Sequence, residues 1–266
     1  MALLAAGLMA TMHPDGWPLI WSDEFDGEVL DPSKWEVVED CWGGGNDERQ
    51  CYAMGNVRLD GSHLVLTAHR EVAPTFAVEA IAPTQVSAYS SGKVRTRGRA
   101  SFRYGRIEVR AWLPRGQGLW PAVWMLPEHD NYGPYPQSGE IDIAEAVNLG
   151  VSCAICSDRI YGARHHGPSL DANRQEGGFA LIGDADTFHV FALEWTPDRM
   201  VWLLDGRPYF EADSGPPWDQ RFHLILNLAV GGRWPEQSGT GGVDNTVFPA
   251  ELRIDYVRVY AMPSVE

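Results

Sequence analysis

The stretch Gly139-Glu140-Ile141-Asp142-Ile143-Ala144-Glu145-Ala146-Val147-Asn148 places three carboxylates within six residues. In a β-strand, successive side chains point to opposite faces, so Glu140 and Asp142 share one face. Strict alternation would turn Glu145 to the other face, but a β-bulge near Ala144 adds one residue and turns it back. The stretch therefore predicts a strand with three acids on one face, although like charges repel and raise each other's pKa.

The apolar residues of this stretch favour a strand over a helix. Ile141, Ile143 and Val147 fit a half-buried strand, because β-branched residues pack well on a pleated sheet. The alternative is a helix that carries Glu140 and Asp142 on a solvated surface.

The spacing of the acids predicts a reaction. Four strand steps of about 3.3 Å separate the backbones of Glu140 and Glu145 by about 13 Å. Each side chain leans along the strand by roughly 3–4 Å, which leaves about 5–6 Å between the two carboxyl groups. Retaining glycosidases need about 5–5.5 Å, whereas inverting enzymes need a wider gap for a water molecule. We therefore predict a retaining glycosidase with Glu140 as nucleophile and Glu145 as general acid/base. Asp142 would orient one glutamate and tune its proton affinity, and catalysis would need no cofactor.

Composition indicates one acidic domain. The 266 residues suffice for a single large β domain, and 28 glycines and 18 prolines indicate many turns. We expect residues 1–15 to form an N-terminal tail or signal remnant and residues 16–266 to form the catalytic domain. The net charge of −15 argues against nucleic acid and anionic membranes as partners and favours a neutral glycan. We expect a monomer.

Four cysteines bear on the compartment. Cys41–Cys51 and Cys153–Cys156 are plausible local disulfides, and free thiols are the alternative. The CxxC of the second pair has no matching CxxC elsewhere, so a structural zinc site is weakly supported. The first ten residues are apolar but lack a basic region, and no stretch has the length of a membrane helix. We expect a soluble protein that is secreted or periplasmic, with an incomplete export signal.

Short strands separated by turns predict an all-β fold. Long amphipathic helical periodicity is absent, and even strand spacing with Gly/Pro turns favours a sandwich of two antiparallel sheets in a jelly roll. Val151–Gly183 is less patterned and is expected to hold long loops near the substrate site. The expected strands are Leu64–Ala68, Arg106–Trp112, Ile141–Val147, Thr187–Trp195, Met200–Leu204, His223–Val230 and Leu252–Tyr260.

Aromatic and polar residues near the acids are candidate sugar contacts. Trp120 and Trp124 lie four residues apart on one strand face, where they are either core residues or rings that stack on sugars. Trp234 is a third candidate wall. Candidate hydroxyl donors are Asn46, Lys93, Arg95 and Arg97, of which the last three are equally explained as a solvated basic stripe. His165 and His166 follow the acidic strand, where one contacts substrate or both are structural.

These residues resemble glycoside hydrolase family 16, in particular its laminarinase-like members. The matching motifs, which run through nearly the whole chain, are Trp21–Phe25, Gly45–Gln50, Tyr104–Ala111, Gly116–Leu126, Gly139–Asn148, Leu226–Gly232 and Ile254–Tyr260. The fifth of these is the family's E-x-D-x-x-E signature in its bulged form.

The resemblance implies a jelly roll with a substrate cleft across its concave sheet. It implies retaining hydrolysis of an internal β-glycosidic bond, most often β-1,3 in a glucan, by Glu140, Asp142 and Glu145. It also implies a structural calcium in many members, whose ligands here would be the Glu24 carboxylate, the Gly61 carbonyl and Asp255.

Three departures from the family pattern bear on the substrate. Cys51 replaces a usual aromatic residue, Gly162–Gly167 differs around His165, and Arg233 stands where Asn is common. They leave the chemistry unchanged but affect the preferred glucan. Alternative functions are hydrolysis of agar or another galactan, hydrolysis of mixed-linkage β-1,3/1,4-glucan, and glucan binding without catalysis.

Overall fold

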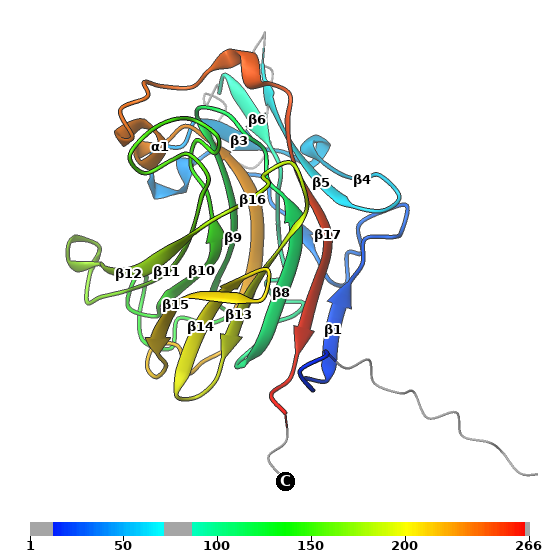
Figure 1. The fold of residues 1–266 in the computed structure, drawn as a ribbon, viewed down its shortest axis with the longest axis vertical. Helices are drawn as coiled ribbons and strands as arrows, with labels where there is room; N and C mark the ends of the chain where they lie inside the picture. Colours follow the sequence, from blue (N-terminus) through cyan, green and yellow to red (C-terminus); the bar gives the residue numbers. More distant parts are fainter. Residues whose placement is uncertain (1–12, 72–86, 264–266) are drawn as a thin grey trace, which may run out of the picture.

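The computed structural model describes residues 13–71 and 87–263. The predicted tail of residues 1–15 therefore lies mostly outside the described residues. Two sheets make up the fold, one of ten strands and one of seven, and they pack face to face as in a jelly roll (Figure 1). Within the described residues, no helix has both the length and the apolar character to cross a membrane.

The ten-stranded sheet has the order β15-β14-β13-β8-β17-β5-β6-β3, with β1 on β17 and β4 on β5. Its neighbours are antiparallel except for the parallel pair β3–β6. Its strands are β1 (Leu19–Asp23), β3 (Gln50–Tyr52), β4 (Val57–Leu59), β5 (Leu64–Arg70), β6 (Tyr89–Ser91), β8 (Gly105–Trp112), β13 (His189–Trp195), β14 (Arg199–Leu204), β15 (Arg207–Asp213) and β17 (Ala250–Tyr260).

The seven-stranded sheet is antiparallel and has the order β12-β11-β10-β9-β16-β7-β2. The short helix α1 (Arg233–Gln237) follows β16 and lies beyond one end of this sheet (Figure 1). The strands are β2 (Glu36–Val37), β7 (Lys93–Arg95), β9 (Leu119–Pro127), β10 (Glu140–Glu145), β11 (Arg159–His166), β12 (Arg174–Leu181) and β16 (Phe222–Val230).

Side-chain alternation divides each strand between a core face and an outer face. On β9, Val123 and Met125 point into the core, whereas Trp120 and Trp124 lie on the opposite face, here called the outer face. Apolar side chains from both sheets fill the space between them. The largest fully buried ones are Trp35, Trp195, Trp202, Phe25, Phe191, Phe222, Leu64, Leu66, Ile107, Leu119, Met125 and Ile141.

The strands predicted from hydrophobic alternation are confirmed, with ends that differ by a few residues. The prediction of long loops over Val151–Gly183 is wrong, because β11 and β12 form an antiparallel hairpin there. Strand β12 has the sequence RQEGGFAL and is mostly exposed. It therefore lacks the apolar alternation that marks a half-buried strand.

Candidate active site

The bulge predicted in the acidic strand is present. Asp142 pairs with Trp124 on β9, and Ala144 pairs with Val123, so Ile143 is the extra residue. Past the bulge, Glu145 pairs with Ala122. Because Ala122 lies on the same face as Trp124, the bulge returns Glu145 to the outer face with Glu140 and Asp142.

Aromatic side chains from other parts of the fold donate hydrogen bonds to backbone carbonyls of the bulged strand. Trp202 Nε1 donates to the Asp142 carbonyl at 2.7 Å, and Tyr209 Oη donates to the Ile143 carbonyl at 3.3 Å. Trp218 Nε1 donates to the Glu140 carbonyl at 3.2 Å. A bulge interrupts the ladder, so these side chains bind carbonyl groups at the bulge and beside it.

His165 from β11 approaches the first two acids. Its Nε2 lies 3.1 Å from Asp142 Oδ2 and 3.8 Å from Glu140 Oε1. The ligand atoms of these three residues lie within 4.8 Å of one another, so among the described residues this group could also hold a metal ion. The predicted substrate contact His165 thus lies directly beside the proposed nucleophile.

Trp120, near the start of β9, binds Glu145. Trp120 Nε1 donates to Glu145 Oε1 at 2.9 Å, and Trp120 itself is 9% exposed. The Trp234 ring packs edge-on against Trp120 at 5.3 Å and against Tyr161 at 5.2 Å. The three aromatic residues therefore form one cluster next to Glu145.

Burial raises the pKa of all three acids. It raises the pKa of Glu145 to about 8, assisted by the charge of Asp142 and opposed by the Trp120 hydrogen bond. It raises the pKa of Asp142 to about 7. Burial and the Asp142 charge together raise the pKa of Glu140 well above its ordinary value, while the His165 charge lowers it. The cluster therefore holds protons at neutral pH.

The raised pKa of Glu145 agrees with its predicted role as general acid, whereas the predicted nucleophile Glu140 also holds a proton. The physical reason is that Glu140 and Asp142 lie together in a buried place, where two adjacent negative charges repel. A hydrogen bond between their carboxyl groups favours the proton on Glu140 and the charge on Asp142. Asp142 is thus the partner that sets the proton affinity of Glu140.

Trp124 is hydrogen-bonded to Asn227, which in turn contacts Tyr52, and neither of these two residues was predicted as a site residue. Trp124 Nε1 donates to Asn227 Oδ1 at 2.7 Å, and Asn227 Nδ2 donates to Tyr52 Oη at 2.9 Å. Lys93 Nζ lies 5.0 Å from the Tyr52 ring centre and 5.9 Å from that of Trp124. An asparagine within the apolar strand FHLILNLAV was the available signal for Asn227.

Two further predicted sugar contacts, Arg95 and Asn46, have partners within the protein. Arg95 Nε donates to Glu36 Oε2 at 2.6 Å. The Asn46 side chain donates to the Gly44 carbonyl at 3.4 Å, and the Asn46 backbone carbonyl accepts from the Arg233 backbone N–H at 2.8 Å. Sugar contact by Arg95 and Asn46 stays a prediction.

The two carboxylates among the predicted calcium ligands are bound by arginines. The Glu24 carboxylate accepts two hydrogen bonds from Arg258, at 3.0 and 2.7 Å, and Asp255 accepts one from Arg110. Gly61 lies in the turn between β4 and β5. Since both carboxylates face guanidinium groups, these residues as arranged do not fit an oxygen cage for calcium.

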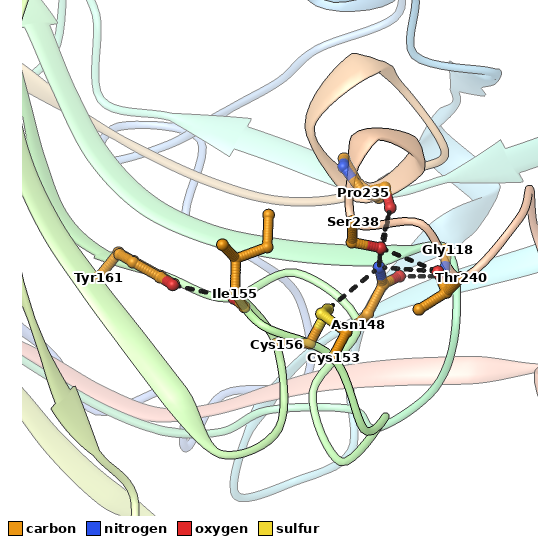
Figure 2. Close-up of a disulfide and its surroundings, with 9 residues drawn as sticks. All are labelled: Gly118, Asn148, Cys153, Ile155, Cys156, Tyr161, Pro235, Ser238 and Thr240. Atoms are coloured by element: carbon orange, nitrogen blue, oxygen red, sulfur yellow. Dashed lines mark hydrogen bonds between the residues drawn. A yellow bond between two sulfur atoms is a disulfide. The ribbon is translucent and has the colours of Figure 1, made fainter.

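Both predicted disulfides form, and the second lies close to the aromatic cluster. Cys153–Cys156 closes a loop in which the Ile155 carbonyl accepts from Tyr161 Oη at 2.9 Å (Figure 2). The buried Asn148 side chain donates to the carbonyl of Pro235, in the helix that carries Trp234, at 2.9 Å. The loop and this helix therefore support the rings around Glu145. Cys41–Cys51 closes the loop before β3.

Comparisons with known proteins find relatives over most of this chain. The model of glycosyl hydrolases family 16 matches residues 44–258. The chain is 41% identical over 263 residues to a β-glucanase of Rhodothermus marinus, which covers 92% of this chain and 85% of that protein. The X-ray structure of the laminarinase from Rhodothermus marinus has a TM-score of 0.79 at 41% identity, covering 92% of this chain and 97% of that one.

A further solved structure contains an oligosaccharide. It is a variant of a non-specific endo-β-1,3(4)-glucanase of family 16, co-crystallized with 1,3-β-D-cellotriosyl-glucose. Its TM-score to this chain is 0.80 at 34% identity, covering 95% of this chain and 97% of that one.

Proposed function

Because the chain belongs to glycoside hydrolase family 16, we propose that it is a retaining endo-glycosidase that hydrolyses internal β-1,3-glucosidic bonds of laminarin-type β-glucans. One observation carries the proposal. The bulge at Ile143 places Glu140, Asp142 and Glu145 on one face of a single strand. Two carboxyl groups on one strand can act on opposite sides of the same linkage.

The first step forms a covalent intermediate. The Glu140 carboxylate attacks the anomeric carbon, and the protonated Glu145 gives its proton to the departing glycosidic oxygen. Asp142 accepts the proton that Glu140 otherwise holds, which frees the nucleophile. The leaving half of the glucan departs as an alcohol, and the other half remains as an ester of Glu140.

The second step releases the product. Glu145, now ionised, removes a proton from a water molecule that attacks the same anomeric carbon. The ester bond to Glu140 breaks, and Glu145 regains its proton. Two displacements at one carbon restore the β configuration. The first step needs a protonated Glu145, which is lost at high pH, and a free Glu140 carboxylate, which is lost at low pH. We therefore expect a bell-shaped pH–rate profile.

The arrangement disfavours a glucan-binding protein without catalysis. A protein that only binds glucan has no need for three buried acids, whose mutual repulsion opposes folding. In this chain all three acids are present, and they converge on one face. Mixed-linkage β-1,3/1,4-glucan is the strongest alternative substrate, because a structural relative is a non-specific endo-β-1,3(4)-glucanase.

Product analysis tests the proposal. The wild-type protein is incubated with laminarin, lichenan, curdlan and agarose, and the released oligosaccharides are identified. We expect laminarin to be cleaved to oligosaccharides, and release from agarose alone would overturn the β-glucanase assignment. Glu140→Ser should abolish turnover on laminarin while binding is retained. Normal hydrolysis by that variant would refute the role of Glu140.

The proposal extends to the setting in which the enzyme acts. We propose an exported enzyme, secreted or periplasmic, and two disulfides support this, since such bonds persist in oxidising compartments. We propose a monomer, because the three acids and His165 all come from one chain. A structural calcium at Glu24, Gly61 and Asp255 would require both carboxylates to leave their arginine partners, and unchanged thermal stability after chelation would contradict it.

A further inference from the structure

The outer face continues beyond the acids onto the β11–β12 hairpin. Glu145 pairs with Tyr161 on β11, and Tyr161 pairs with Phe179 on β12. The three side chains therefore form a row across the strands, from the acid/base to the edge of the sheet. The Tyr161 and Phe179 rings lie 5.8 Å apart and are tilted by 48°.

Phe179 is an unusual residue for its place. The residues of β12 that precede it, Arg174–Gly178, are charged, polar or glycine, and the Phe179 side chain is 47% exposed. An exposed aromatic ring on an edge strand contributes little to the core, because its apolar surface stays in contact with water. It does offer a flat apolar surface to the C–H face of a sugar.

The neighbouring row of residues on the same face has small side chains on β11 and β12. Asp142 pairs with Ala163, and Ala163 pairs with Gly177. A Cβ atom on Gly177 would lie 2.6 Å from the Gly162 carbonyl oxygen, so a side chain does not fit there without a shift of the backbone. Small residues beside Tyr161 and Phe179 leave room for a ring to approach the two aromatic side chains.

A hydrogen-bond donor lies beside the exposed ring. The Arg159 guanidinium carbon is 4.4 Å from the centre of the Phe179 ring. Arg159 and Tyr161 share the outer face of β11, because they are two residues apart. An apolar ring next to a planar set of N–H donors suits a neutral sugar, which presents C–H groups on its faces and hydroxyl groups at its edge.

We propose that Phe179, with Tyr161 and Arg159, forms a further subsite for a glucosyl ring of the substrate at the hairpin edge. The proposal rests on the glucanase function proposed above. Strand β12 lies two strand spacings, roughly 10 Å, from the acidic strand. A glucan that crosses the strands between Glu140 and Glu145 thus reaches Phe179 a short way from the cleaved bond.

Replacing the ring tests the subsite. Phe179→Ala should raise KM for laminarin about two- to tenfold and leave kcat unchanged, because the ring binds ground state and transition state equally. Ile20→Ala is the control, since Ile20 is an apolar residue that is 58% exposed on β1, in the other sheet. Phe179→Trp should retain the wild-type KM. A short oligosaccharide that does not reach the hairpin should be cleaved equally by all variants.

The outcomes separate this inference from the function it rests on. If Phe179→Ala has the wild-type KM for laminarin, or if Ile20→Ala raises KM equally, the subsite is refuted while the glucanase function stands. If wild-type protein does not cleave laminarin, the function itself is refuted. Direct binding of laminarin to Phe179→Ala in the Glu140→Ser background gives the same comparison without turnover.

Discussion

Glu145 combines a buried position with a hydrogen bond that favours its charged form. Burial in a place shared with Asp142 raises its pKa to about 8, whereas the Trp120 indole opposes that rise. The balance leaves the carboxyl group protonated at neutral pH, as a general acid requires. The same proton has a consequence for stability.

The stability of the wild-type protein should fall as pH rises from 4.5 to about 8. The unfolded chain loses the Glu145 proton near the ordinary value of 4.5, whereas the folded protein keeps it to about pH 8. Glu145→Gln removes the contribution of Glu145 to this dependence and still offers Trp120 an acceptor. We expect its melting temperature to match wild type at pH 4.5 and to exceed it by on the order of 5 °C at pH 8.

Differential scanning calorimetry at the two pH values makes this comparison. Glu211→Gln serves as the control, because Glu211 is exposed and pairs with Arg199 at 3.4 Å on the other sheet. A Glu145→Gln difference that is the same at pH 4.5 and pH 8 would contradict the buried proton.

Among individual residues, the three acids are easier to predict from the sequence than the residues that surround them. The three acids were identifiable because they lie within six residues, and His165 because it matches a family position. Tyr52, Asn227 and Tyr161 were not identified. Their roles depend on contacts between strands far apart in the chain, such as the bond from Asn227 to Tyr52.

At the scale of elements, the acidic strand depends on a donor from the opposite sheet. Trp202 reaches across the core from β14 and donates to the Asp142 carbonyl beside the bulge. The bulge aims Glu145, so a group that fixes the backbone there also fixes the spacing of the acids.

Trp202→Phe should therefore lower both stability and activity. Loss of the bond leaves a buried carbonyl unpaired, at about 1–3 kcal/mol, and the smaller ring adds to the loss. We expect kcat on laminarin to fall about tenfold or more, because the acids lose their fixed geometry. Urea unfolding and steady-state kinetics measure the two effects.

Trp195→Phe is the matched control for this prediction. Trp195 is fully buried on the neighbouring strand β13 and donates to Ser214 Oγ at 3.2 Å, away from the acids. It should destabilise the protein to a similar degree and leave kcat unchanged. Equal kcat values for the two variants would show that the Trp202 bond does not position the acids.

Strand prediction from sequence depended on burial. The seven strands that were predicted are rich in buried apolar residues, and the bulge was predicted because three acids on one face required it. Strand β12 was missed, because its residues Arg174–Leu181 lie at an exposed edge where pairing with β11 defines the strand. The missed edge is where the proposed subsite lies.

At the scale of the whole molecule, the disulfides close loops of different lengths. Cys41–Cys51 spans ten residues and Cys153–Cys156 spans three. The longer loop loses more chain entropy when its ends are joined. Cys41→Ser with Cys51→Ser should therefore cost more stability, about 3 kcal/mol against about 2 kcal/mol for the other pair.

Denaturant unfolding of the two double variants under non-reducing conditions compares these losses. The second pair should have the larger effect on catalysis, because its loop binds Tyr161 (Figure 2), and the Tyr161 ring packs against Trp234. A larger loss of kcat from the first pair would contradict that support.

The proposed mechanism requires two displacements at one carbon by two glutamates on one strand. Proton NMR of the new reducing ends during the first minutes of laminarin hydrolysis tests this most directly. We predict that β-configured reducing ends appear first and that the α form follows only by mutarotation. Initial formation of the α anomer would mean inversion and would contradict the role given to Glu140.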